Sequence, residues 1–340
     1  MANVPLDVTF ILLTTGAIWL GSGWLESASE KLSAYYGLPE VVQGSIVTAI
    51  GSSFPELATV VVAAITVGSL ELGVGAIVGS AIFNILVIPA IAGIATKDDI
   101  ESNRTLVYKE AQFYMLAVSV LVITFAMAVI YYPDTSVDHI AGNITRPLAA
   151  IPIALYGLYI FIQYQDTADH VADPDEGNNV DVYRQWGLLL AGLFVILVAV
   201  ERLVHSVDIL GTEFGIPQFI MGVTVAAGAT SLPDALVSLR AAKDDRGVAS
   251  LANVLGSNTF DLLVAIPVGV MIVGSTPINF EMAVPMFAVL TLATILLFTV
   301  LRTGLALSSL ESYALLTSYL LFVVWVVAES TTEVVDYLPN

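Results

Sequence analysis

Apolar runs of about 20 residues recur along the whole chain, separated by shorter polar segments. A run of that length crosses the hydrocarbon core of a bilayer as an α-helix, because a helix bonds its backbone N–H and C=O groups internally. The short alternating segments that are typical of a β-barrel do not occur in the sequence. Only 12% of the 340 residues are charged, whereas a soluble domain carries about 25%. The sequence therefore predicts an all-α membrane protein.

The apolar runs divide into two sets of five. An acidic linker at 165–184 separates a first five-helix repeat, 1–164, from a second, 185–340. Because five is odd, the second set enters the membrane from the opposite side, which predicts an inverted repeat. The first run, from near Val8, follows no basic region and precedes no evident cleavage site, so we interpret it as a span. The ten predicted transmembrane helices are 6–27, 40–67, 72–95, 107–132, 146–164, 186–209, 217–241, 247–274, 281–301 and 308–328.

One polar motif occurs in both halves, at 44–94 and at 222–272. Each copy has a carboxylate directly after a proline, and then Gly-Ser-x-x-Phe followed by a second oxygen-bearing side chain. The matched pairs are Glu56 with Asp234 (234 − 56 = 178), Asn84 with Asp261 (261 − 84 = 177), and, upstream, Gly37-Leu38-Pro39 with Gly215-Ile216-Pro217. A duplicated polar motif inside apolar segments indicates a binding site where two structural repeats meet.

The second and seventh predicted helices are each interrupted at this motif. Pro55 and Pro233 lack an N–H and clash with the preceding turn, and Gly51 and Gly228 loosen the same turn. The carbonyl groups freed there need an internal partner such as water, a side chain or a cation, because they cannot face lipid unpaired. Broken helices at matching positions in both halves predict an ion site near the bilayer midplane.

Three acids lie deep in the apolar segments: Glu56, Asp234 and Asp261. Each would cost about 2.5–3.5 kcal/mol at a helix centre, so we expect all three to face the protein interior. Asn84 is the neutral counterpart of Asp261. The hydroxyl groups around them are those of Ser52, Ser53, Ser80, Thr230, Ser231 and Ser257. No basic residue lies within the motifs, so the acids need protons or metal cations as partners.

The expected ligands are all oxygen atoms, which suits hard cations such as Ca²⁺ with its roughly six to eight oxygen ligands. Zinc or copper would favour histidine or cysteine. The chain has no cysteine, and its histidines, His139, His170 and His205, lie outside the motifs. We find neither the nucleophile–base set of a hydrolase nor the basic patch of a nucleic-acid partner. These observations favour a transporter over an enzyme.

Other residues have structural interpretations. Acids near the ends of the predicted helices are interpreted as interfacial: Glu26, Glu201, Asp208, Glu311 and Glu329. Glycines that let helices approach closely are predicted at Gly73, Gly75 and Gly93.

The basic residues predict the orientation in the membrane. With both termini outside, the cytoplasmic ends of the helices hold Lys31, Lys97, Arg104, Lys109, Arg184, Arg240, Lys243, Arg246 and Arg302. Only Arg146 and Arg202 are then left outside, as the positive-inside rule requires. The linker at 165–184 is then cytoplasmic, and the chain is a multi-pass protein of the cell membrane.

At these motifs the sequence resembles the sodium/calcium exchanger family of cation/calcium antiporters, in its prokaryotic form without a regulatory domain. Gly-Ser-Ser-Phe-Pro-Glu at 51–56, Ala-Thr-Ser-Leu-Pro-Asp at 229–234 and the two Gly-Ser-x-x-Phe motifs carry the resemblance. It implies that Glu56 and Asp234 are the main Ca²⁺ carboxylates and that Asn84 and Asp261 complete a diamond of sites. It also implies flanking Na⁺ ligands, namely Ser52, Ser53, Ser80, Thr230, Ser231, Ser257 and the backbone carbonyls near Ala49 and Ala227.

The function implied is secondary active exchange of Na⁺ for Ca²⁺ by alternating access, with the two ions as cargo, the bilayer as partner and no cofactor. In the family, spans one and six slide against a core of spans two, three, seven and eight. Potassium-dependent exchange stays open because Asp261 is the acid also found in potassium-dependent relatives. A Ca²⁺/H⁺ antiporter and a cation channel also stay open, although the Gly-Asn-x-x-Glu pattern of proton-coupled members is missing.

Overall fold

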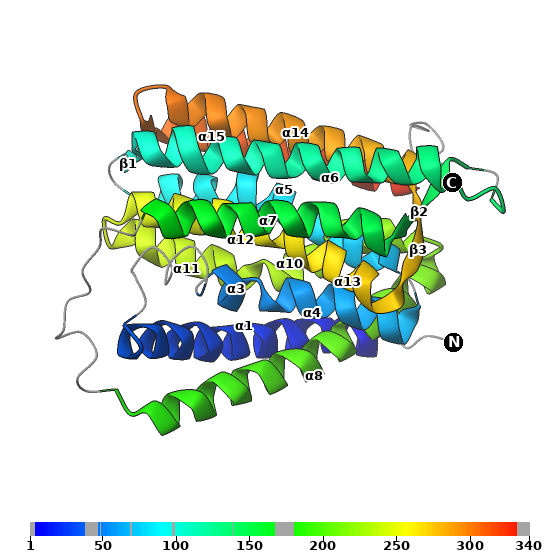
Figure 1. Cartoon of the computed structure of the whole chain (residues 1–340), viewed down its shortest axis with the longest axis horizontal. Coiled ribbons are helices and arrows are strands. Elements are labelled where there is room, and N and C mark those ends of the chain that lie inside the picture. The colour runs from blue at the N-terminus through cyan, green and yellow to red at the C-terminus, as the bar shows by residue number, and fades with distance from the viewer. Residues whose placement is uncertain are drawn as a thin grey trace.

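The computed structural model describes residues 4–37, 47, 49–68, 70–96, 99–137, 139–166 and 180–331. Nearly all of its regular structure is helical, and the long helices run side by side along the long axis of the molecule (Figure 1). Within these residues, eight helices are long and apolar enough to cross a membrane, and a bent pair, Gln218–Thr230 with Leu232–Lys243, makes a ninth. The prediction of an all-α membrane protein is confirmed.

The helices of the first half are α1 (Val4–Tyr35), α3 (Ala49–Ser52), α4 (Phe54–Val62), η2 (Ala63–Val67), α5 (Leu70–Ala95), η3 (Leu106–Glu110), α6 (Ala111–Tyr131) and α7 (Arg146–Asp166). Those of the second half are α8 (Val182–Phe214), α9 (Gln218–Met221), η4 (Gly222–Ala226), α10 (Ala227–Thr230), α11 (Leu232–Lys243), α12 (Gly247–Phe260), η5 (Asp261–Ala265), α13 (Ile266–Val273), α14 (Phe280–Arg302) and α15 (Ser309–Thr331). Each η segment is a short π-helical stretch that continues or precedes an α-helix.

The nine spans match nine of the ten predicted ones. Much of the first part of the predicted helix 40–67 lies outside the described residues, and its remainder forms α3, α4 and η2. Most of the linker 165–184, with His170, and also Lys97 lie outside them as well. The prediction ended the first helix too early, because α1 continues past residue 27 to Tyr35. Its last turns carry buried serines that pack against the protein.

Four short strands join the helix connections in pairs, which the sequence did not predict. β1 (Ile100–Glu101) pairs antiparallel with β4 (Ala306–Leu307), and β2 (Ala141–Thr145) pairs antiparallel with β3 (Ser275–Asn279). The two pairs lie at opposite ends of the helices (Figure 1). We call these ends the β1/β4 side and the β2/β3 side. α1 begins and α15 ends on the β2/β3 side (Figure 1).

α5 is the most buried of the spanning helices and lies at the centre of the fold. Its glycines allow close contact with neighbouring backbone. A Cβ atom at Gly75 or Gly79 would collide with the carbonyl oxygen of Phe219 or Val223. At Gly73 a Cβ would come within 2.8 Å of the Val60 Cα, and at Gly93 it would collide with the Ser312 hydroxyl. The packing role predicted for Gly73, Gly75 and Gly93 is confirmed.

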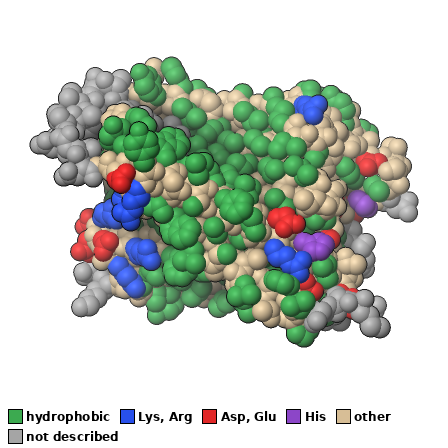
Figure 2. All heavy atoms as spheres, turned by 90° about the horizontal axis from the view of Figure 1, so that it is seen from below, with side chains coloured by type: hydrophobic (Ala, Val, Ile, Leu, Met, Phe, Trp, Pro, Cys, Tyr) green, Lys and Arg blue, Asp and Glu red, His purple; other side chains and the backbone are tan. Residues whose placement is uncertain are grey.

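α1 and α8 form an outer layer on one side of the molecule, opposite α6, α14 and α15 (Figure 1). They cross closely where a Cβ on Gly192 would lie 2.7 Å from the Gly21 carbonyl oxygen. Arg202 of α8 lies 3.8 Å from Asp7 of α1 and 3.9 Å above the Phe10 ring centre. Figure 2 shows that the face on this side is mostly hydrophobic through its middle, with charged side chains toward its two ends. This pattern suits a surface that faces lipid.

Candidate cation site

The two broken helices supply the central polar residues. α3 ends at Ser52 and α4 begins at Phe54, while α10 ends at Thr230 and α11 begins at Leu232 with a bend of 45°. Pro55 and Pro233 occupy the first turns of α4 and α11, where a missing N–H is tolerated. The breaks therefore fall at Ser53 and Ser231, within the stretches 51–55 and 228–233 that the sequence predicted to be interrupted.

The first carboxylate of each motif lies in the first turn after the break. Glu56 belongs to α4 and Asp234 to α11, and both are fully buried. Asn84 on α5 and Asp261 at the start of η5 are also fully buried. The Asn84 amide nitrogen donates to Asp234 Oδ2 over 3.2 Å. The fold thus brings residues 150 positions apart into direct contact.

Five oxygen atoms of this group have no hydrogen-bond partner although they are buried. They are Glu56 Oε2, Asn84 Oδ1, Asp234 Oδ1, Asp261 Oδ1 and Asp261 Oδ2. Buried polar groups are otherwise almost always satisfied, and a buried unpaired carboxylate is strongly disfavoured. Lys109 pairs with Glu110 and Arg202 with Asp7, both away from this group. The chemistry of these oxygens fits hard cations or protons as their partners.

The predicted hydroxyl groups lie among these acids. Ser80 donates to Glu56 Oε1 over 3.4 Å and accepts from the Ser231 hydroxyl over 2.7 Å. The Ser53 hydroxyl donates to the Ser257 carbonyl oxygen over 3.3 Å, and its side chain lies beside Asp261. Two further neighbours come from the opposite half, with Ser52 beside Asp234 and Thr230 beside Glu56, and Ser257 of the same half also lies beside Asp234.

The backbone ligands predicted from the sequence are the carbonyl oxygens near Ala49 and Ala227. Ala49 is the first residue of α3. The Ala227 carbonyl oxygen accepts from the Ser231 amide over 3.0 Å and from the Thr230 hydroxyl over 3.4 Å. The Thr230 hydroxyl has a single proton, and its shorter contact is to the Ala226 carbonyl oxygen over 3.2 Å. The Ser231 amide is therefore the regular partner of the Ala227 oxygen, which keeps one lone pair for an ion.

Asn258 belongs to the same cluster and was missed by the sequence reasoning. Its fully buried side chain donates to the Ala81 carbonyl oxygen over 3.2 Å and to the Tyr114 hydroxyl over 3.3 Å. It accepts from the Asn84 amide nitrogen over 3.0 Å. Asn258 therefore holds the Asn84 side chain by its amide nitrogen, and Asn84 Oδ1 is left without a hydrogen-bond partner. An amide in the middle of the second Gly-Ser-x-x-Phe motif was the available signal.

The acids do not form a cage by themselves. Among the described residues, no three His, Cys, Asp or Glu side chains lie close enough together to hold a metal ion alone. Neutral hydroxyl, amide and carbonyl oxygens would have to complete any coordination shell. Two histidines lie apart from the site, His139 half-buried in the loop before β2 and His205 exposed on α8.

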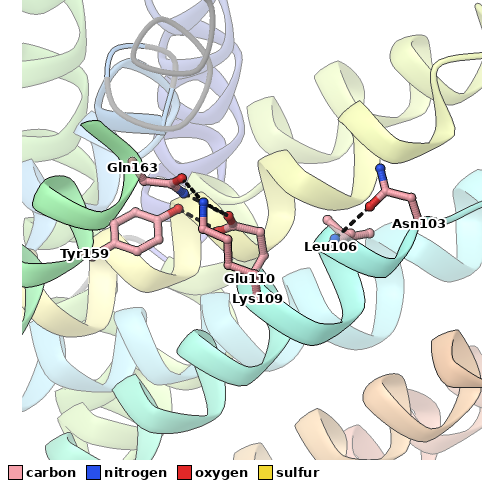
Figure 3. A network of polar contacts seen from close by, with 6 residues as sticks. All are labelled: Asn103, Leu106, Lys109, Glu110, Tyr159 and Gln163. Atoms are coloured by element: carbon pink, nitrogen blue, oxygen red, sulfur yellow. Dashed lines mark hydrogen bonds and ion pairs between the residues drawn. The ribbon is translucent and has the colours of Figure 1, made fainter. Parts of the chain in front are cut away.

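A second polar cluster lies between η3 and α7 (Figure 3). Glu110 accepts from the Tyr159 hydroxyl over 2.9 Å and from the Gln163 amide over 2.8 Å, and it pairs with Lys109 over 3.6 Å. Its charges are balanced within the cluster and its acceptors are used, in contrast to the central group. This cluster therefore ties α7 to the start of α6 and offers no open coordination.

Comparison with known proteins gives a consistent result. The family model described as "Sodium/calcium exchanger protein" matches residues 7–165 and 184–328. An uncharacterized membrane protein, MJ0091, of Methanocaldococcus jannaschii is 28% identical over 279 residues, covering 82% of this chain and 86% of the relative. The putative antiporter CaxA of Alkalimonas amylolytica is 25% identical over 80% of this chain and 81% of the relative.

Two further matches differ in extent. The human sodium/potassium/calcium exchanger 4 is 44% identical over 66 residues only, which is 19% of this chain and 11% of the relative. A structure of the sodium-calcium exchanger NCX_Mj, soaked with 10 mM Na⁺ and zero Ca²⁺, superimposes with a TM-score of 0.64. It covers 94% of this chain and 99% of that chain at 24% identity, so this likeness concerns the fold.

Proposed function

Because the chain belongs to the sodium/calcium exchanger family, we propose that it exchanges Na⁺ for Ca²⁺ by alternating access at the site described above. That family is one of cation exchangers, so the activity that we propose is transport. The observation that carries the proposal is the group of five buried, unpartnered oxygens on Glu56, Asn84, Asp234 and Asp261. These atoms need a cation or protons as partners.

In the proposed site, Glu56 and Asp234 are the main Ca²⁺ carboxylates, and Asn84 and Asp261 complete the set. The flanking hydroxyls of Ser52, Ser53, Ser80, Thr230, Ser231 and Ser257, with carbonyl oxygens near Ala49 and Ala227, serve Na⁺. All of these ligands are oxygen atoms, and flexible oxygen coordination suits both ions. The two ions compete because they draw on the same oxygens.

The charge of the site gives a reason for obligatory exchange. Three ionised acids without a counter-charge are very unfavourable in a low-dielectric interior. The empty site therefore disfavours the occluded state through which the protein must pass to change its accessible side. One Ca²⁺ or several Na⁺ ions neutralise the acids and permit that passage. Entry of Na⁺ on one side then drives Ca²⁺ out on the other.

We further propose that 1–164 and 185–340 are inverted five-helix repeats joined by a cytoplasmic linker at 165–184. Gly37 and Gly215, which the 178-residue spacing matches, both have φ of 66° shortly after α1 and α8. The strand pairs support the same symmetry, because the β1 loop of the first half pairs with the second half at one end, and the β3 loop pairs with the first half at the other end. Inverted repeats of this kind place the ion site at their interface.

The proposed orientation has both termini outside. Arg104 and Arg302 line a hollow of about 560 Å³ on the β1/β4 side, with Tyr108 beneath Arg302. Arg146 follows β2 directly on the other side. An excess of basic residues on the β1/β4 side favours that side as the cytoplasmic one.

Potassium-dependent exchange is the second candidate. Both oxygens of Asp261 are buried without a partner, so this acid offers a full additional negative charge for a monovalent cation. The short match to the sodium/potassium/calcium exchanger 4 supports the same possibility.

The test is Ca²⁺ uptake into proteoliposomes loaded with Na⁺ and diluted into Na⁺-free buffer, with and without K⁺. Uptake that requires internal Na⁺ supports the proposal, and dependence on K⁺ selects the second candidate. Uptake driven only by a pH gradient would replace both by proton coupling. Uptake that is indifferent to every ion on the opposite side would indicate a channel and contradict obligatory exchange.

A further inference from the structure

α1 carries a polar stripe that the central site does not use. Its residues, Ser22, Glu26, Ser29 and Ser33, follow one another at spacings of four, three and four, so they lie on one face of the helix. The three serines are buried, with exposed fractions of 2%, 8% and 3%, and Glu26 is partly buried. The Ser22 hydroxyl has no hydrogen-bond partner.

The stripe faces the broken helices. A Cβ atom at Gly51 in α3 would lie 3.8 Å from the Glu26 Cα and 3.9 Å from the Ser29 hydroxyl. α1 also packs against α10 and α11. The Glu26 carboxyl interacts electrostatically with Asp234 of the central site and with Glu30 and Arg240. From Glu26, close to Asp234, the stripe continues through Ser29 and Ser33 toward the β1/β4 side, where α1 ends.

The matched face of α8 has the opposite character. The 178-residue spacing pairs Ser22 with Val200 (22 + 178), Glu26 with Val204 (26 + 178), Ser29 with Val207 (29 + 178) and Ser33 with Gly211 (33 + 178). The three valines belong to an apolar cluster with Ala58, Ala63 and Met221. Ser206 of α8 is polar but matches Ala28, outside the stripe (28 + 178 = 206).

Close helix packing alone does not explain the stripe. Small serine side chains allow two helices to pack closely. A glutamate is large and charged, and the matched position on α8 is the apolar Val204, so packing does not require a charged residue there. On α1, the contact with α8 is made through Ile18, Gly21 and Leu25, which lie on the face that adjoins the stripe. A carboxylate close to Asp234 and a buried, unpartnered hydroxyl one turn away on the same helix face are features of a path for hydrated cations.

We propose that Ser22, Glu26, Ser29 and Ser33 line the half-pathway between the central site and the β1/β4 side, with Glu26 as a staging ligand for entering cations. The inference rests on the proposed exchange at the central site. Glu26, interpreted from sequence as an interfacial acid, becomes a second binding position beyond Asp234 on the way to the β1/β4 side. In this conformation, the matched valines of α8 close the other half-pathway, which would connect the central site with the β2/β3 side.

Site-directed labelling tests the path without requiring transport. The chain has no cysteine, so single substitutions can be labelled with a membrane-impermeant cationic thiol reagent. We expect Ser29→Cys and Ser33→Cys to react from the β1/β4 side, which is cytoplasmic in the proposed orientation. Val207→Cys, the matched control, should not react from that side. If neither of these two cysteines reacts, while a cysteine at the exposed end of α1 does react, the inference is overturned even if Na⁺/Ca²⁺ exchange is established.

Kinetics test the role of Glu26. In Glu26→Gln, the KM for Ca²⁺ added on the β1/β4 side should rise about five-fold, while the maximal rate and the KM on the other side stay within about two-fold. Glu201→Gln, an exposed glutamate on α8, is the matched control and should leave both KM values unchanged. Glu26→Asp should restore most of the affinity. Equal KM changes on both sides, or none, would contradict a staging role.

If the wild-type chain shows no Na⁺-dependent Ca²⁺ flux, the proposed exchange fails. Labelling of Ser29→Cys and Ser33→Cys from one side would then still support an aqueous path along α1. The two failures are therefore distinguishable.

Discussion

α1 and α8 occupy matched places in the two halves, yet they present different faces to the broken helices. α1 offers Ser22, Glu26 and Ser29, whereas α8 offers valines at the equivalent positions. The motifs behind them differ less, because each keeps a carboxylate directly after the proline of a broken helix. Under the proposed inverted repeat, the two halves keep the broken helix and its carboxylate in common, while the faces that α1 and α8 turn toward the broken helices differ.

The largest expected effect tests whether the two halves contribute equally to the central site. Glu56→Gln and Asp234→Asn should each lower Ca²⁺ transport by at least about 100-fold, because each removes a charged ligand from a buried site. Na⁺-dependent Ca²⁺ uptake at matched protein levels is the measurement. Both variants should unfold at or above the wild-type temperature, since neutral amides relieve buried charge. Near-normal uptake in either variant would break the equivalence of Glu56 and Asp234.

The next effect compares two glycines of the motifs. Gly79→Ala should destabilise the protein by about 1–3 kcal/mol, because its Cβ would collide with the Val223 carbonyl oxygen and force α5 away from η4. Gly228→Ala is the control, since a Cβ there meets nothing within 4 Å. Thermal unfolding in detergent measures both. Equal melting temperatures of the two variants would show that α5 and η4 do not pack as closely as described.

A third prediction concerns the asymmetry between Asn84 and Asp261. Asp261→Asn makes the second pair identical in both halves, and it should lower the apparent Ca²⁺ affinity about ten-fold without abolishing transport, because Glu56 and Asp234 remain. Any stimulation by K⁺ should disappear. The measurement is the Ca²⁺ dependence of Na⁺-driven uptake at several K⁺ concentrations. Persistent K⁺ stimulation would exclude Asp261 as the ligand for that ion.

The sequence predicted the parts of the site that depend on local chemistry. Pro55 and Pro233 interrupt the hydrogen bonding of a helix by their own structure, so an interruption of both helices close to these prolines could be predicted. An acid in an apolar run must turn inward, which located Glu56, Asp234 and Asp261. The packing glycines followed from the same membrane rules.

What the sequence did not predict depends on contacts between distant segments. Asn258 is one amide among several polar residues until the fold brings Asn84 and Tyr114 to it. The strands are two to five residues long, and only their partners across the molecule define them. Glu26 was placed at a helix end because the predicted helix stops at residue 27, whereas α1 continues to Tyr35 through a polar stretch with buried serines. Periodicity of polar residues on α1 was the missed signal.

The smallest expected effect concerns the contact between α1 and α8 themselves. Asp7→Asn removes the charge that lies 3.8 Å from Arg202, and it should cost about 0.5–1 kcal/mol, since Arg202 is partly exposed and also stacks on Phe10. Unfolding at low and high salt is the measurement, and the difference between wild type and variant should shrink as salt rises. Phe10→Leu, which keeps the ion pair, is the control and should show no such salt dependence. If Asp7→Asn instead changes transport and leaves stability unchanged, the ion pair acts on the movement of the two helices. The difference between α1 and α8 would then include the way in which they are held together, in addition to the faces that they turn toward the broken helices.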